Sequence, residues 1–239
     1  MSINNKRILA VVPARGGSKG VIKKNLRKLN EKSLIALAAN IISDINEIDY
    51  SIISSDDDDM INEGIKYGLD APFVRPIHLS GDQISDVEVL THALIESEKH
   101  KNFEFDIILM IQPTSPMRDA ADIMSAINNL LENNFDSVFS ISKTDSKAHP
   151  LKQFNINGNI LSYYDDRGKN IIARQQLKNT YHKDGIVYVM TRACLLDQKT
   201  IMGNNPGFII TNRDTVNIDT EKDLLLAEIM IKNHKFTKE

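Results

Sequence analysis

The sequence predicts an α/β fold built on an open, mostly parallel sheet, and two observations carry this prediction. Short runs of apolar, β-branched residues, such as "RILAVV" at 7–12, are typical of strands that are buried on both faces. Between residues 7 and 142, strand, loop and helix patterns alternate four times. Such alternation favours parallel strands that are joined by crossover helices.

Each element follows from a local pattern of side chains. The apolar runs that predict strands lie at 7–12, 50–55, 105–112 and 136–142. The segments with helical spacing of apolar residues lie at 33–45, 56–68, 85–100 and 119–134. Ser33 and Ser85 are typical helix N-caps, and Gly68 is a typical helix end. The four acids at 56–59 are expected to begin a helix at its positive end rather than to bind a metal.

The pattern changes after residue 142. Residues 143–183 are polar, with short extended pieces around the turn sequence "NING", and are expected to form an insertion outside the main sheet. A strand at 185–191 returns to the sheet, and 215–233 predicts a strand-like stub and a helix capped by Asp219 or Thr220. The expected core is therefore 1–142 with 184–239.

Composition sets broad limits on function. Of the 239 residues, 41% are hydrophobic and 26% charged, which is typical of a globular domain. The net charge of -3 gives no sign of a nucleic-acid or membrane partner, so any basic site is expected to be local. The single cysteine, Cys194, excludes an internal disulfide and fits a reducing compartment. No apolar segment approaches the roughly 20 residues of a membrane span, so we expect a soluble, cytoplasmic protein.

The loop at 13–25, "PARGGSKGVIKKN", follows the first predicted strand, where open α/β sheets bind ligands. Its spacing matches neither a P-loop nor a dinucleotide-binding fingerprint. Its three glycines let backbone N–H groups approach an anion, and its basic side chains and serine hydroxyl suit phosphate oxygens. A polyphosphate site is therefore predicted, with a solvated basic turn as the alternative.

Five motifs, in this order, resemble those of the CMP-N-acylneuraminate synthetases, the cytidylyltransferases that activate sialic and related nonulosonic acids. They are "PARGGSKG" with the following "KN", "FVRPIHLSGD", "IQPTSPMR", "ARQQLKNTYHKDGIVYV" and "VNIDTEKDL". The resemblance implies a Rossmann-like nucleotidyltransferase core with a small dimerisation insertion. It also implies the reaction, in which the anomeric hydroxyl of the sugar acid attacks the α-phosphorus of CTP and pyrophosphate leaves.

The resemblance also implies roles for individual residues. The implied catalytic residues are Arg15, Lys24 and Asp219. The implied nucleotide-binding residues are Arg15, Ser18, Lys19, Lys24, Asn25, Arg75, Asp82 and Ser85. The implied sugar-binding residues are Gln112, Thr114, Ser115, Lys152, Arg174 and Tyr181. A guanidinium can hold phosphate through two parallel hydrogen bonds and a lysine acts as a point charge, so both suit a triphosphate.

A divalent cation, Mg²⁺ or Mn²⁺, is implied beside the triphosphate. The family usually has two aspartates one residue apart, whereas this sequence has Asn217 and Asp219. Alternate residues of an extended segment face the same side, so both can reach one ion, with Asp219 expected as the essential ligand and Asn217 as a weaker or indirect one. His182 and Asp184 replace the family's usual arginine and asparagine, and these departures leave the identity of the sugar open.

The implied partners are CTP, a nonulosonic acid and a second copy of the chain, because in this family the insertion exchanges sugar-site residues across a dimer. Two alternatives stay open. A CMP-Kdo synthetase shares the fold and chemistry, although the "KN" of the first motif and "QPTSPMR" favour the sialate branch. The other is a non-catalytic nucleotide-binding homologue, for which Asn217 is the main support.

Overall fold

A six-stranded sheet forms the centre of the protein, whose computed structural model describes residues 3–18 and 20–236. The strands in spatial order are β10 Pro206–Ile210, β6 Ser137–Lys143, β9 Tyr181–Thr191, β5 Ile107–Met110, β1 Ile8–Pro13 and β4 Tyr50–Ser54. β9 runs antiparallel to both of its neighbours, and the other pairs are parallel. This confirms the predicted open, mostly parallel α/β sheet.

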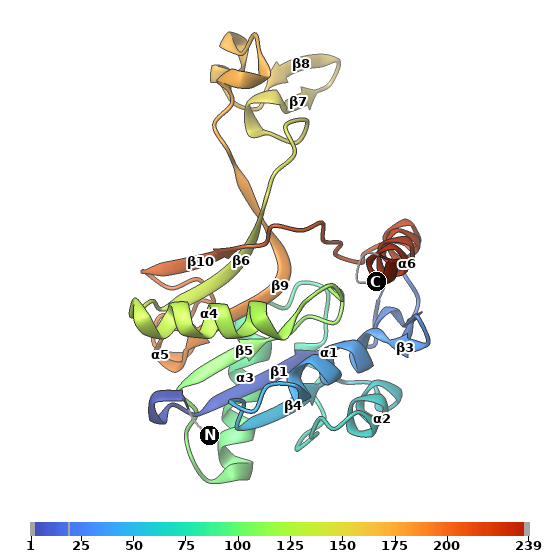
Figure 1. Ribbon diagram of the computed structural model, residues 1–239, viewed down its shortest axis with the longest axis vertical. Coiled ribbons are helices and arrows are strands. Elements are labelled where there is room, and N and C mark those ends of the chain that lie inside the picture. Colours follow the sequence, from blue (N-terminus) through green and yellow to red (C-terminus); the bar gives the residue numbers. More distant parts are fainter. Residues whose placement is uncertain (1–2, 19, 237–239) are drawn as a thin grey trace.

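Helices cover both faces of the sheet (Figure 1). One face carries α1 Leu34–Ser43, α2 Asp58–Lys66 and α4 Ala120–Glu132, and the other carries α3 Asp86–Lys101 and α5 Arg192–Leu196. Short 3₁₀ helices lie at Ile3–Asn5, Lys24–Leu26, Ile77–Leu79, Pro150–Lys152, Asp166–Asn170 and Arg174–Gln176. The chain closes with α6 Glu221–Phe236, and no described helix is long and apolar enough to cross a membrane.

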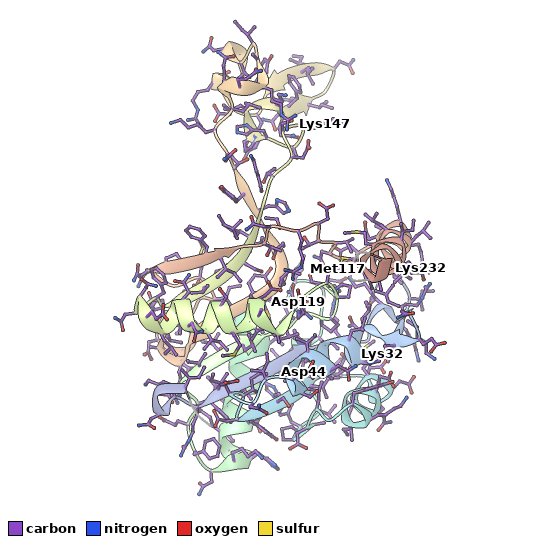
Figure 2. All side chains as sticks on the ribbon, viewed as in Figure 1. Lys32, Asp44, Met117, Asp119, Lys147 and Lys232 are labelled. Atoms are coloured by element: carbon purple, nitrogen blue, oxygen red, sulfur yellow. The ribbon has the colours of Figure 1, made fainter. Side chains whose placement is uncertain are left out.

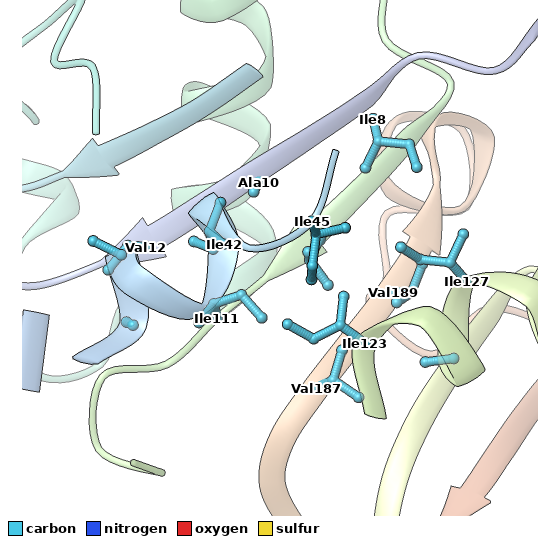
Figure 3. Close-up of a cluster of buried hydrophobic side chains, with 14 of the residues drawn as sticks. Ile8, Ala10, Val12, Ile42, Ile45, Ile111, Ile123, Ile127, Val187 and Val189 are labelled. Atoms are coloured by element: carbon cyan, nitrogen blue, oxygen red, sulfur yellow. The ribbon is translucent and has the colours of Figure 1, made fainter. Parts of the chain in front are cut away.

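β1 holds the two helical layers together because its side chains alternate between them. Ile8, Ala10 and Val12 pack into the cluster of α1 and α4, drawn in Figure 3. Leu9 and Val11 pack instead against α3 and α5. All five are fully buried, so the loop that follows β1 starts from a strand packed on both faces.

The predicted helix ends are confirmed by their hydrogen bonds. The Ser33 hydroxyl accepts from the backbone N–H of Ala36, and Ser85 forms a capping box with Glu88 at the start of α3. Gly68 follows α2 with a φ of 89°, a left-handed conformation that glycine adopts without strain. Asp57 caps α2, as expected of an acid that precedes a helix.

Three small features were not predicted. β10 and α5 have five residues each, and β10 is an edge strand whose pairing with β6 joins segments far apart in the sequence. A hairpin of β2 Lys28–Leu29 and β3 Lys32–Ser33 turns through two residues of positive φ between the glycine-rich loop and α1. With α6 and residues 216–218 it forms a third apolar cluster.

The segment between β6 and β9 projects from the sheet as a separate lobe (Figure 1). Its centre is a hairpin of β7 Phe154–Asn157 and β8 Ile160–Tyr163, turning at the predicted "NING" sequence. Figure 2 shows Lys147 on this lobe, far from Met117 and Asp119 in the core. β9 begins at Tyr181, earlier than the predicted residue 185, because Tyr181–Lys183 pair with the end of β6 at the base of the lobe.

Candidate active site

A cleft of about 430 Å³ opens beyond the carboxyl ends of β1 and β5. Four segments distant in sequence meet there, at residues 13–25, 75–89, 112–114 and 217–219. The predicted residues that line it are Arg15, Ser18, Lys24, Asn25, Arg75, Asp82, Gln112, Thr114, Asn217 and Asp219. This is the position at which open α/β sheets bind ligands.

The glycine-rich loop is fixed by contacts on two sides. The backbone N–H of Gly16 donates to the Asp56 carboxylate at 3.0 Å, whereas Lys23 Nζ and Asp59 Oδ2, 2.5 Å apart, form a solvent-exposed pair that contributes little to holding the loop. On the other side, a Cβ added to Gly20 would lie 2.3 Å from the backbone oxygen of Asp219. The acidic run at 56–59 therefore begins α2, as predicted, and also anchors the loop, which was not predicted.

Arg15 and Lys24, the two side chains predicted to bind the triphosphate, are each paired with a carboxylate in the cleft. Arg15 Nη1 lies 2.5 Å from Asp82 Oδ1, and Lys24 Nζ lies 2.8 Å from Asp219 Oδ1. Next to them, Arg27 makes two bonds to the Glu221 carboxylate, of 2.6 and 3.1 Å. The cleft thus combines cations that suit a polyphosphate with anions that balance them when no ligand is bound.

Arg75 is a buried cationic side chain that lines the cleft. It is 4% exposed, and its guanidinium donates to both the hydroxyl and the backbone oxygen of Ser54. Burial lowers the pKa of Arg75 to about 10, against the opposing influence of Asp56, so the side chain stays charged at neutral pH. The apolar side chains that line the cleft beside it are Leu79, Ile84 and Val89.

Asp86 also lines the cleft, and the sequence reasoning missed it. It is exposed as a residue, yet desolvation of its carboxyl raises its pKa, opposed by Lys183 and Arg75. An acid in the first turn of a helix is already explained by the helix dipole, so its type and position gave no separate signal for a site.

The two predicted metal ligands lie in the segment before α6. As expected of an extended chain, both side chains face the same side. Val216 and Ile218 are buried, whereas Asn217 and Asp219 are exposed and line the cleft. The cap of α6 is Thr220, whose hydroxyl accepts from the backbone N–H of Asp223 and donates to its carboxylate. Of the two predicted caps Thr220 is therefore correct, and the Asp219 carboxylate is left to the cleft.

The "QPTSP" loop lies against both residues 217–219 and β9. The backbone N–H of Ile218 donates to the backbone oxygen of Thr114 at 2.8 Å. Ser115 is fully buried and donates to the backbone oxygen of Asp184, so the structure does not place it on the cleft. The Asp184 carboxylate is also buried and accepts from the hydroxyls of Ser140 and Ser142. That departure from the family pattern thus has a structural role.

Lys19 aside, the remaining predicted residues do not line the cleft. The Ser85 hydroxyl is used in the capping box of α3, and Lys19 lies outside the described residues. Lys152 and Arg174 belong to the lobe, and Tyr181 lies at its base. Arg174 lines a second cavity, of about 620 Å³, between the lobe and the sheet. Within one chain, the predicted sugar-binding residues are therefore divided between the cleft and the lobe, apart from Ser115, which is buried against β9.

Comparisons with known proteins agree with this geometry. Residues 9–211 match a family model described as cytidylyltransferase. The chain is 31% identical over 229 residues to the pseudaminic acid cytidylyltransferase of Campylobacter jejuni, covering 95% of this chain and 97% of that one. It is 29% identical over 229 residues to a CMP-N,N'-diacetyllegionaminic acid synthase of the same species, covering 94% of each.

A solved structure shows the same fold. It is a CMP:2-keto-3-deoxy-manno-octonic acid synthetase complexed with CTP, with a TM-score of 0.72 and 17% identity over 96% of this chain and 100% of that one. The family match spans most of the sequence, and the similarity to the pseudaminic acid enzyme spans nearly all of both chains. The chain therefore belongs to the cytidylyltransferase family, and it is a nucleotidyltransferase.

Proposed function

We propose that this enzyme transfers CMP from CTP to the anomeric hydroxyl of a nonulosonic acid and releases pyrophosphate. The observation that carries the proposal is the convergence of the triphosphate, base, acceptor and metal motifs on one cleft. Relatives named for pseudaminic and legionaminic acids are similar over nearly the whole chain. The Kdo enzyme is similar in fold at 17% identity, which favours a nonulosonic acid over Kdo as acceptor.

The triphosphate of CTP would lie along the glycine-rich loop. Arg15 and Lys24 offset its charge, and Ser18 and the backbone near Gly20 border the same part of the cleft. Asn25 is 5% exposed, and its side-chain oxygen has no hydrogen-bond partner among the described residues. A buried acceptor without a partner is costly, so this oxygen is available to a donor on the bound nucleotide.

The cytosine would lie between Arg75 and the apolar side chains of Leu79, Ile84 and Val89. A guanidinium that stays charged can donate to O2 or N3 of cytosine. Uracil carries a proton on N3, so it presents one acceptor fewer to the same donor. This difference accounts for a preference for CTP over UTP.

The residues at the end of the cleft fit a divalent cation. Asp219 supplies a carboxylate and Asn217 an amide oxygen on the same side of one extended segment. Mg²⁺ is commonly held by one or two carboxylates together with substrate phosphates and water. When bound, such an ion offsets negative charge on the departing pyrophosphate. Lys24, beside Asp219, contributes a fixed positive charge to the same leaving group.

The acceptor would enter beside Gln112 and Thr114, and its carboxylate needs a cation. We assign that role to Lys152 and Arg174 of a second copy, because both lie on the lobe and away from the cleft of their own chain. The lobe carries exposed apolar side chains, with Ile156 at 78% and Ile172 at 93% exposure, as expected of an interface between subunits.

The test is pyrophosphate release with Mg²⁺, comparing CTP with UTP, ATP and GTP. Each nucleotide is combined with neuraminic, legionaminic, pseudaminic and Kdo acceptors. We expect release with CTP and one nonulosonic acid. Release only with Kdo would identify the enzyme as a CMP-Kdo synthetase. No release from folded protein with any pair would support the non-catalytic alternative.

A further inference from the structure

β5 and β9 separate at the mouth of the cleft. Their antiparallel ladder ends with the pair Met110 and Tyr188. Past this pair, the backbone N–H of Ile111 continues the ladder with β1 by donating to the Val11 oxygen, and β9 turns through Gly185 with a φ of 76°. Buried backbone oxygens beyond the end of this ladder need donors other than the facing strand.

The guanidinium of Arg118 supplies those donors. Its Nη2 donates to the backbone oxygen of Gln112 at 2.6 Å and to that of Gly185 at 3.2 Å. Its Nε donates to the backbone oxygen of Ile186 at 2.8 Å. One planar group thus joins the end of β5 to the start of the buried part of β9.

This contact closes a short loop on itself. Arg118 lies six residues after Gln112 in the sequence. Between them, the Ser115 hydroxyl donates to the backbone oxygen of Asp184 in β9. The fit is tight, because a Cβ added to Gly185 would lie 2.3 Å from Ser115 Oγ and 3.5 Å from Gln112 Oε1. The side-chain amide of Gln112 therefore lies directly over the backbone that Arg118 holds.

Arg118 itself does not face the cleft. It is 4% exposed and is not among the residues that line the cavity, whereas Gln112 is. Burial lowers the pKa of Arg118 to about 9, and the nearby Asp122 and Asp184 carboxylates oppose that shift, so it stays charged at neutral pH. Its three bonds go to backbone oxygens of three different residues and come from two separate nitrogens of a rigid plane, Nε and Nη2, whereas lysine offers a single nitrogen at the end of a flexible chain.

We propose that Arg118 is the positioning residue for Gln112, holding its amide at the orientation that the acceptor sugar requires. The inference rests on the proposed function, since it takes Gln112 as the contact to the acceptor. Arg118 acts through the backbone of Gln112 and touches neither substrate. The nucleotide end of the cleft is held separately, by the loop after β1 and by Arg75, so its affinity should not depend on Arg118.

The experiment is a double-mutant cycle between Arg118→Lys and Gln112→Ala, read as KM for the acceptor and KM for CTP. Arg118→Lys keeps the charge, and an unchanged KM for CTP reports that the variant is folded. Each single variant should raise the acceptor KM about tenfold and leave the CTP KM within about twofold. The double variant should match Gln112→Ala alone, because Arg118 has no other route to the acceptor.

Arg213→Met is the matched control. Arg213 also holds this loop through a backbone oxygen, that of Met117, but at the end away from Gln112. Its acceptor KM should stay within about twofold of the wild-type value. Effects of Arg118→Lys and Gln112→Ala that multiply, or an equal rise in both KM values, would overturn the proposal. Wild-type enzyme that is silent with every acceptor would instead overturn the proposed function, and this inference with it.

Discussion

Lys24 and Asp219 form an ion pair across the cleft, with Lys24 Nζ 2.8 Å from Asp219 Oδ1, although 195 positions separate them in the sequence. The Lys24 side chain is 18% exposed, whereas that of Asp219 is 67% exposed. The pair joins the proposed triphosphate cation to the proposed metal ligand. If nucleotide and metal bind as proposed, the triphosphate would draw Lys24 away from Asp219, and the metal would draw Asp219 away from Lys24.

Lys24→Met should separate the two roles of this pair. Pyrophosphate release should fall about 100-fold or more, because a preorganised charge beside the leaving group is lost. Mn²⁺ should bind the nucleotide-free protein about fivefold more tightly, because a unit positive charge close to Asp219 is removed. Mn²⁺ affinity is measured directly by electron paramagnetic resonance of the free ion.

Lys23→Met is the control for Lys24→Met. Lys23 is adjacent in sequence, but it is exposed and pairs with Asp59 at the edge of α2. Both measured quantities should stay near their wild-type values. A loss of turnover in Lys23→Met that equals the loss in Lys24→Met would show that the general charge of the loop matters, rather than the pairing of one lysine.

Asn217 and Asp219 should contribute unequally to metal binding. Asp219→Asn should abolish detectable Mn²⁺ binding and reduce turnover about 100-fold, because the only carboxylate of this segment that faces the cleft is lost. Asn217→Asp should tighten Mn²⁺ binding and preserve or raise turnover at low Mg²⁺. A large loss of turnover in Asn217→Asp at saturating Mg²⁺ would remove Asn217 from the metal site.

Gly20 should be required because a larger side chain would have no room there, rather than because the backbone needs a conformation that only glycine adopts. An added Cβ would lie 2.3 Å from the backbone oxygen of Asp219, so Gly20→Ala must push the loop away from residues 217–219. We expect at least a tenfold loss of turnover, since displacements of about 1 Å in active sites have effects of this size. Turnover of Gly17→Ala, where an added Cβ meets open space, should change less than about twofold. Equal losses would favour a general need for glycine near phosphate.

The elements that could be predicted from the sequence are those whose signals are local. β1 and β5 are continuous apolar runs, and the loop after β1 has its place because parallel strands end at one edge of a sheet. The antiparallel entry of β9 between β5 and β6 could not be predicted in this way. It depends on how the chain returns from the lobe, which is a property of tertiary contacts.

The candidate site shows the same difference between residues with a local sequence signal and residues placed by tertiary contacts. Arg15, Lys24 and Gln112 could be predicted because ordered motifs mark them. Ser115 was expected at the sugar, but its hydroxyl reaches back to β9, a contact between residues 69 positions apart. The motif that contains Arg118 indicates no role for it, for the same reason. Its three partners become visible only when β5 and β9 lie side by side.

Asp184 should tolerate asparagine, the residue usual in the family, better than alanine. Its carboxylate accepts from Ser140, Ser142 and the backbone N–H of Ile186, all in a buried environment. Asp184→Ala leaves these donors without an acceptor and should cost about 2 to 3 kcal/mol of unfolding free energy. Asp184→Asn keeps an acceptor oxygen and should cost less than about 1 kcal/mol. Urea unfolding measures both, and equal losses would mean that the negative charge itself is required.

Mixed dimers provide the sharpest test of the shared sugar site. Arg174→Ala leaves the cleft intact but damages the lobe, and Gln112→Ala does the reverse. If each lobe completes the cleft of the other chain, a heterodimer of these two variants contains one fully intact site and one doubly damaged site. Co-expression with two affinity tags isolates that heterodimer.

The heterodimer should recover about half of the wild-type turnover per dimer, whereas either homodimer remains impaired at both sites. If Arg174 served the cleft of its own chain instead, every site in the heterodimer would carry one damaged residue, and turnover would stay low. Size-exclusion chromatography with light scattering supplies the necessary control, because a monomeric wild-type enzyme would rule out a site shared between subunits.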